Sequence, residues 1–180
     1  MERGKMSKVR DQANRLYGAE EFSGIKYQQP MTLKECQKFA DKVVSRKYVK
    51  DTYGSSSSIL VLDGRGRRAA CATHQYGRRV IKLPKWSRTK FVILHEIAHH
   101  LVGLEYGHRP AFASCLLDLV RHFLGKESAD SLQVGYHLKG VKVLGKNGAT
   151  KARCPQSKKE WLASEKEREK RLKEKLEKVA

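Results

Sequence analysis

The segment FVILHEIAHHLVGL, residues 91–104, constrains the fold more than any other part of the chain. Apolar side chains occupy nearly every position around its circumference, and a helix that is apolar on all sides belongs in a protein interior. Histidines and one glutamate interrupt the apolar run. Because buried imidazoles and carboxylates need partners, the rest of the chain is expected to fold around this helix and supply them. Ser87 is the expected N-cap.

His95, Glu96 and His99 form an HExxH pattern. Residues four apart lie on one face of a helix, with Cβ atoms about 5–6 Å apart, so two imidazoles can reach one metal ion. The pattern predicts a divalent metal site with zinc as the first choice, although manganese and iron also accept imidazole ligands. Glu96 is predicted to be the general base that takes a proton from a metal-activated water.

A catalytic zinc ion usually has three protein ligands, so one more is expected. The downstream candidates are His100, Glu105, His108, His122 and His137. His100 is rotated about 100° around the helix from the residue before it, which makes it a poor third ligand. We favour His108, because Gly107 lets the chain turn back before a helix that begins at Pro110. Glu105 is the alternative.

The remaining pattern predicts an α+β fold. A short helix is expected in VRDQANRLYGAEEF, a capping box in TLKE begins a helix over 33–46, and two more helices are expected over 110–124 and 127–138. SSSSILVLDGRGRRAACATH predicts two strands joined by the turn DGRG, RRVIKLP a third strand, and GVKVL a last short one.

Composition shifts divide the chain into three parts. Residues 1–30 are polar and irregular and are expected to be an N-terminal extension. Residues 31–145 are expected to form the folded domain. Residues 146–180 are expected to be a linker followed by a charged helix over 159–178, in which glutamates precede basic residues by four positions.

Charge and cysteine content limit which partners and which cellular compartment are expected. The chain has 38 Lys and Arg against 19 Asp and Glu, a net charge of +19, so two interpretations stay open: non-specific contact of the basic surface with nucleic acid, or a basic surface with no dedicated partner. No apolar run approaches the ~20 residues of a membrane span, and the N-terminal residues contain no signal-like run. The four cysteines include no CxxC pair and are expected to be reduced. These features predict a cytoplasmic protein without membrane contact.

HEIAHHL followed by GHRPAF resembles the HExxH and HxPxF arrangement of SprT-like zincins, and most closely a metallohydrolase family of phages and their high-GC bacterial hosts. LDGRGRRA and VGYHLKGVKV resemble further blocks of that family. The resemblance implies a zincin-like fold, in which a small antiparallel sheet packs on the HExxH helix and Arg79–Leu83 is the strand to which a peptide adds. It implies His95, His99 and His108 as ligands and Glu96 as base. A phage-encoded protein would act in the host cytoplasm.

Two further roles are expected at such a site. An oxyanion stabiliser could be Tyr136, His137 or Arg109, and a carboxylate behind the ligands could be Asp118. The leading hypothesis is a zinc metallopeptidase that acts on a protein or peptide substrate. The alternative is a basic nucleic-acid-binding or phage host-interaction protein whose metal site is structural or vestigial.

Overall fold

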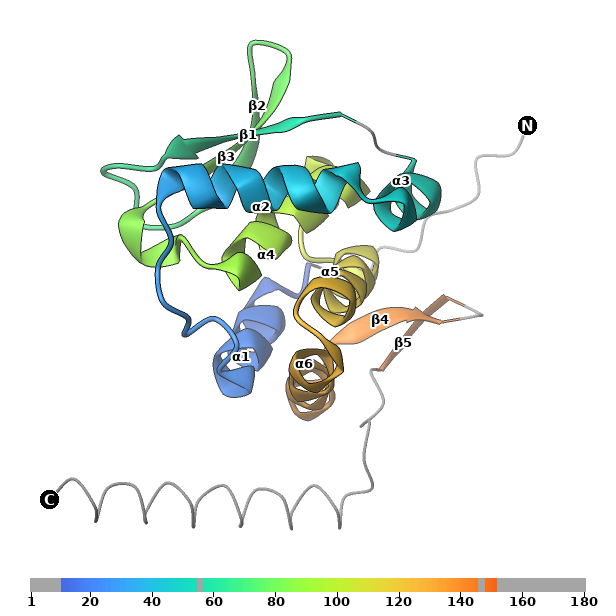
Figure 1. The fold of residues 1–180 in the computed structure, drawn as a ribbon. Helices are drawn as coiled ribbons and strands as arrows, with labels where there is room; N and C mark the ends of the chain where they lie inside the picture. The colour runs from blue at the N-terminus through green and yellow to red at the C-terminus, as the bar shows by residue number, and fades with distance from the viewer. Residues whose placement is uncertain (1–10, 55–56, 146–147, 152–180) are drawn as a thin grey trace, which may run out of the picture.

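The computed structural model describes residues 11–54, 57–145 and 148–151, and these form an α+β fold, as expected (Figure 1). The helices are α1 Ala13–Ser23, α2 Leu33–Ser45, α3 Lys47–Tyr53, α4 Lys90–Val102, α5 Pro110–Phe123 and α6 Lys126–Lys139, with 3-10 turns η1 Lys85–Ser87 and η2 Leu104–Tyr106. The strands are β1 Ile59–Asp63, β2 Cys71–Gln75, β3 Arg78–Leu83, β4 Lys142–Gly145 and β5 Gly148–Lys151.

The three-stranded sheet is mixed, in the order β1-β3-β2. β1 runs parallel to β3, and β2 runs antiparallel to it. The expected hairpin of β1 with β2 and the expected antiparallel sheet are therefore wrong. The tight turn lies instead at Tyr76–Gly77, between β2 and β3, where both residues have positive φ as a two-residue hairpin turn requires. The predicted DGRG turn spans the end of β1 and the start of the segment 64–70, and this segment carries the chain past the position of β3 to β2.

The central place of β3 also changes where a peptide strand could add. β3 pairs on both sides, so Arg79–Leu83 has no free edge and the expectation that a peptide adds there is wrong. β2 is an edge strand of this sheet. The backbone amide of its Ala72 hydrogen-bonds to Glu96 of α4, so the free edge of β2 borders the HExxH helix.

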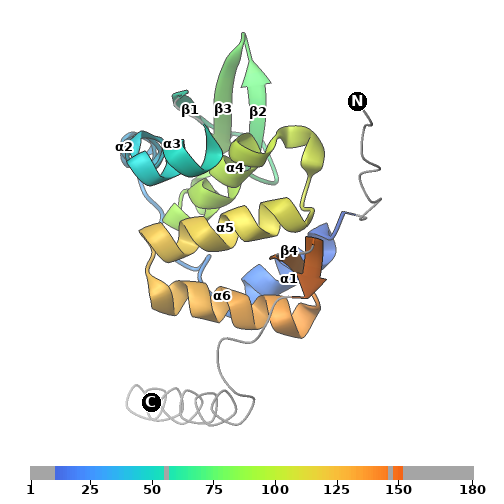
Figure 2. The same cartoon turned by 90° about the vertical axis from the view of Figure 1, so that its right-hand side faces the viewer.

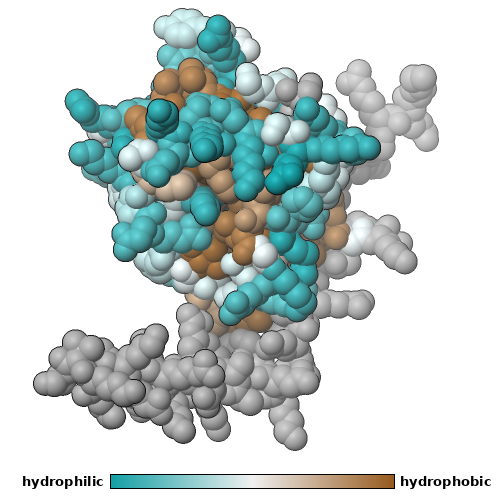
Figure 3. Space-filling model, viewed as in Figure 1, coloured by the Kyte–Doolittle hydropathy of each residue, from teal (hydrophilic) through white to brown (hydrophobic). Residues whose placement is uncertain are grey.

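α4 and α2 lie between the sheet and a second group of helices, α5, α6 and α1 (Figures 1 and 2). α2 begins at the predicted capping box: the Thr32 hydroxyl accepts from the Glu35 amide, and the Glu35 carboxylate accepts from the Thr32 amide. Its inner face buries Cys36, Phe39, Ala40, Val43 and Val44. Its outer face is hydrophilic in Figure 3. No helix of the described residues is long and apolar enough to cross a membrane.

α1 is part of the folded domain, which corrects the expected boundary at residue 31. It packs against α6, where Gly135 lets the backbones approach so closely that a Cβ there would lie 2.5 Å from the Ala19 carbonyl oxygen. Just before α1, the Gln12 side chain donates to the Lys142 carbonyl and accepts from the Lys142 amide, both at 2.8 Å. These contacts hold residues 11–23 against the rest of the fold.

The C-terminal part of the chain is described only as far as residue 151. β5 pairs antiparallel with β4, so the first residues of the expected linker belong to a hairpin. The expected helix over 159–178 lies outside the described residues.

Candidate metal centre

α4 presents His95, Glu96 and His99 from one buried helix. The N-cap is Thr89, two residues after the expected Ser87, because the Thr89 hydroxyl caps the helix by accepting from the Val92 amide at 3.3 Å. Ser87 belongs to η1, and its hydroxyl donates to the Pro84 carbonyl. His95 and Glu96 are each 6% exposed, so neither side chain is solvated as on a protein surface.

His108 reaches the same point from the segment after α4. The chain leaves α4 through η2 and turns back at Gly107, whose φ of +53° is a backbone conformation that residues with a side chain rarely adopt. The ligand nitrogens of His95, His99 and His108 all lie within 4.8 Å of one another. The structure thus brings together the three histidines that the sequence favoured.

The spacing of two of these nitrogens fits one tetrahedral ion. The Nε2 atoms of His95 and His108 are 3.3 Å apart. Two ligands at the usual Zn–N distance of about 2.0–2.1 Å are separated by roughly 3.4 Å across a tetrahedron. The Phe112 ring packs against all three imidazoles, with centroid distances of 4.3 to 4.9 Å, and restricts their orientation.

Two carboxylates from the N-terminal segment contact the metal-ligand candidates, one at an imidazole and one at a backbone amide. Glu20 Oε1 lies 2.7 Å from His95 Nδ1, and both side chains are buried. The Asp11 carboxylate accepts from the His108 amide at 3.3 Å. A carboxylate on Nδ1 fixes the tautomer that leaves Nε2 free to bind a metal. Asp118 does not take this place; it neighbours Tyr53 and Arg121 on the other side of α5.

The electrostatics of the histidines reflect burial and mutual repulsion. Burial lowers the pKa of His99 to about 3, helped by the neighbouring histidines, so its ring is neutral as a metal ligand must be. Burial also lowers the pKa of His108, with His95 adding to the effect. Burial alone would lower the pKa of His95 too, but the Glu20 charge and hydrogen bond outweigh it and raise that pKa.

Glu96 lies next to a small recess rather than in the packed core. Burial raises the pKa of its carboxyl group, while His95 and the Ala72 amide oppose that shift. Glu96 and His95 line a cavity of about 170 Å³ together with residues of α1, η1 and the segment before β2. Glu96 therefore borders a space that a small group can enter.

Tyr17 is a site residue that the sequence reasoning missed. Its hydroxyl oxygen lies 3.1 Å from His108 Nε2, and its ring stacks on His95 at an interplanar angle of 13°. Tyr17 also lines the recess beside Glu96. Burial, together with the charge of Glu20, raises the pKa of its hydroxyl to about 12, so this phenol is protonated and can donate a hydrogen bond. Only its helical spacing of three from Glu20 could have suggested a shared face.

None of the predicted oxyanion candidates lines the recess beside Glu96. Tyr136 is fully buried, so its phenol is not presented to a substrate. His137 is exposed on α6. Arg109 is half-buried at the N-cap of α5, adjacent to His108 in the chain. Of these three, only Arg109 begins from a backbone position next to a ligand.

The other candidate ligands also stand apart from the three histidines. Glu105 is exposed on η2. The ring of His100 is turned to the sheet, with Nε2 3.1 Å from the Val80 carbonyl oxygen. His122 stacks on Tyr48 at a centroid distance of 4.3 Å.

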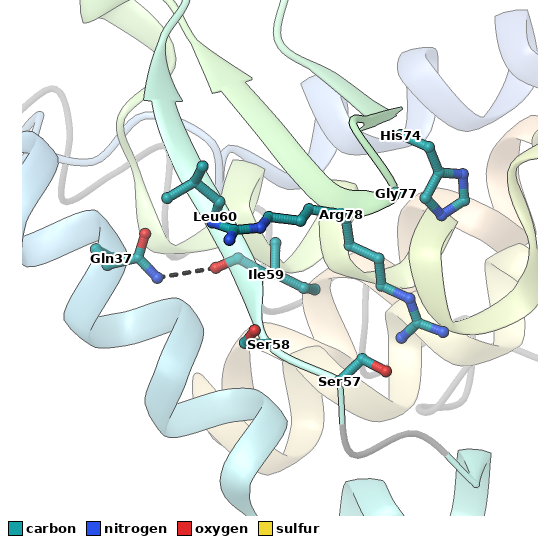
Figure 4. Close-up of a pocket in the computed structure, with 9 residues that line it drawn as sticks. Gln37, Ser57, Ser58, Ile59, Leu60, His74, Gly77 and Arg78 are labelled. Carbon is teal, nitrogen blue, oxygen red and sulfur yellow. Dashed lines mark hydrogen bonds between the residues drawn. The ribbon is translucent and has the colours of Figure 1, made fainter.

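A larger cavity, of about 600 Å³, lies between α2 and the strands (Figure 4). Gln37 lines it and donates to the Ile59 carbonyl at 2.8 Å, while Arg78 and His74 line its other side. None of the three clustered histidines and no part of Glu96 borders this cavity. Its size therefore says nothing about the chemistry of the metal centre.

Comparisons of the chain with protein-family models, curated proteins and solved structures find no match. The function must therefore be inferred from the side chains of the site and their geometry.

Proposed function

We propose that this chain is a zinc-dependent hydrolase of peptide bonds. The observation that carries the proposal is the convergence of three imidazoles on one point, with the Glu96 carboxylate next to them in a recess. A metal site that only stabilises a fold is closed by four protein ligands and needs no neighbouring base. Three ligands with a carboxylate at the open side are the arrangement expected for metal-assisted hydrolysis.

The donor set supports zinc. Neutral imidazoles suit several first-row metals, and a three-histidine set with one open position is typical of catalytic zinc. Glu20 on Nδ1 of His95 would hold that ring in the orientation that binding needs, and Asp11 accepts from the His108 backbone amide and so helps to place its backbone. When bound, a zinc ion would polarise a carbonyl oxygen and lower the pKa of a water.

Two residues of the chain have the remaining catalytic roles, Glu96 in proton transfer and Tyr17 in stabilising the oxyanion. Glu96 takes a proton from the attacking water and delivers it to the leaving amine nitrogen, as a general base that becomes a general acid. The Tyr17 hydroxyl faces the same recess and donates a hydrogen bond to the carbonyl oxygen as that oxygen gains negative charge. Tyr17 takes the role for which Tyr136 is too deeply buried.

The edge of β2 supports an extended peptide as the substrate. The Ala72 amide points away from β3 towards Glu96, and in an antiparallel pair the backbone groups of His74, two residues on, point the same way. An extended chain can add to such an edge through main-chain hydrogen bonds. This would carry a scissile bond past Glu96.

Replacing Glu96 with Gln tests the mechanism. We expect the purified Glu96→Gln protein to retain zinc by elemental analysis and to lose at least about a hundredfold in the rate of peptide-library digestion, because it lacks the base. Glu127→Gln, which removes an exposed carboxylate on α6, is the matched control and should digest the library at the wild-type rate. Undiminished digestion by Glu96→Gln, or a zinc-loaded wild type that digests nothing, would contradict the proposal.

A further inference from the structure

The recess beside Glu96 has one apolar wall and one reactive wall. The apolar wall comes from three separate segments: Ala69 and Ala70 before β2, Trp86 in η1, and Phe91 and Val92 in the first turn of α4. The reactive wall consists of Tyr17, Glu20, His95 and Glu96, with Lys26 also in the lining.

Trp86 is 61% exposed although it is a large apolar side chain. An indole at the rim of a cavity offers a rigid apolar surface, and such residues concentrate where proteins bind partners. The neighbouring Phe91 is 1% exposed, so the recess continues inward from the indole towards the core.

The size of the recess suits one large side chain. Its volume is about 170 Å³. A cavity of about 150 Å³ lined by apolar side chains is large enough to hold a benzene ring. The side chain of Leu, Met or Phe would therefore fill the recess.

The charged groups of the lining already have partners. Glu20 pairs with His95, Lys26 pairs with Glu21, and Glu96 accepts from the Ala72 amide. A charged side chain that entered the recess would lose its hydration without gaining an equivalent partner, which is costly. An apolar side chain has no charge to dehydrate, and its binding removes the exposed face of Trp86 from water, which is favourable.

We infer that this recess is a specificity pocket that binds a bulky apolar side chain next to the scissile bond. This inference rests on the proposed function, because the pocket matters for catalysis only if Glu96 acts on a bound peptide. It names the substrate class: peptides or unfolded protein segments with Leu, Met or Phe beside the cleaved bond.

The first test measures cleavage of short quenched-fluorescence peptides that share one frame and differ in a single residue, Leu, Phe, Ser or Asp. We expect kcat/KM for Leu and Phe to exceed that for Ser and Asp by roughly tenfold or more. Trp86→Ala should remove most of this discrimination, and Ala70→Leu, which fills the recess, should lower cleavage of the Leu and Phe peptides. Tyr76→Ala removes an aromatic side chain that is 93% exposed in the β2–β3 turn, and it should leave the discrimination unchanged.

The second test separates this inference from the proposed function. Binding of the same peptides, labelled with fluorescein, is followed by anisotropy with the zinc-loaded Glu96→Gln protein. Tighter binding of the Leu and Phe peptides that Trp86→Ala weakens would support the pocket even if the wild type hydrolysed nothing. Glu96-dependent hydrolysis at equal rates for all four peptides would overturn the pocket and leave the hydrolase. Binding that does not depend on the variable residue would overturn it as well.

Discussion

At the scale of single residues, Glu20 shows how a site depends on side chains outside its motif. Glu20 lies 75 positions before His95 in the chain, yet its carboxylate is 2.7 Å from Nδ1 of that histidine. It is only 6% exposed, and a buried carboxylate is tolerated because it is paired and hydrogen-bonded. The same contact orients the imidazole and increases its basicity towards a metal.

Replacing Glu20 with Gln should therefore weaken metal binding. The amide keeps the size of the side chain but removes the charge, and loss of such a carboxylate typically costs about 10–100-fold in metal affinity. Competition with a coloured zinc chelator measures this affinity directly. Glu21→Gln, an exposed neighbour on the same helix, is the control and should bind zinc as the wild type does. Equal affinity of Glu20→Gln and wild type would show that the carboxylate does not support the site.

At the scale of elements, the placement of α1 decides whether the site is complete. α1 carries both Tyr17 and Glu20, and it is held against α6 at the close approach between Gly135 and Ala19. Because the backbones meet there without an intervening side chain, the position of α1 is sensitive to a single added methyl group.

Two glycine-to-alanine changes test this packing. Gly135→Ala would place a Cβ 2.5 Å from the Ala19 carbonyl oxygen, so we expect a loss of about 1–3 kcal/mol in the free energy of unfolding and weaker zinc binding as α1 shifts. Gly18→Ala meets only the flexible Lys139 side chain at 3.6 Å, so it should be neutral or stabilise by about 0.5–1 kcal/mol. Urea denaturation measures both variants. An equally stable Gly135→Ala protein would refute the close contact.

At the scale of the whole molecule, the candidate metal centre joins segments that are separate in the chain. α4 supplies two imidazoles and the turn before α5 supplies the third, while Glu20 and Asp11 tie the N-terminal segment to both. An ion bound there would favour the folded state, because the unfolded chain has no such convergence of ligands.

Zinc should consequently raise the thermal stability of the protein. At a free concentration about 100 times its Kd, the stabilisation is about 2.7 kcal/mol, which corresponds to a rise in Tm of roughly 5–10 °C for a chain of this size. Thermal melts with and without a chelator measure the shift. His108→Ala should abolish most of it, whereas His122→Ala, which changes an exposed histidine stacked on Tyr48, should retain it. A full shift in the His108 variant would place the bound ion elsewhere.

Local patterns predicted the elements well and their pairing poorly. The capping box at Thr32 and the apolar periodicity of α2, α5 and α6 located those helices to within two residues, because helix formation depends on neighbours three and four apart. The same alternation of apolar residues fits several strand pairings. The parallel pairing of β1 with β3 depends on contacts between distant residues, so the sequence pattern led to the wrong hairpin.

Short stretches of consecutive residues were enough to predict the HExxH helix and the turn at Gly107 and to favour the three histidines that meet, because each of these features rests on local backbone geometry. Three features emerge from the three-dimensional fold alone: α1 packs into the domain, Glu20 and Tyr17 contact the imidazoles, and β2 rather than β3 has a free edge. These relations join positions far apart in the chain, and it is side-chain packing in three dimensions that selects them from many locally equivalent arrangements.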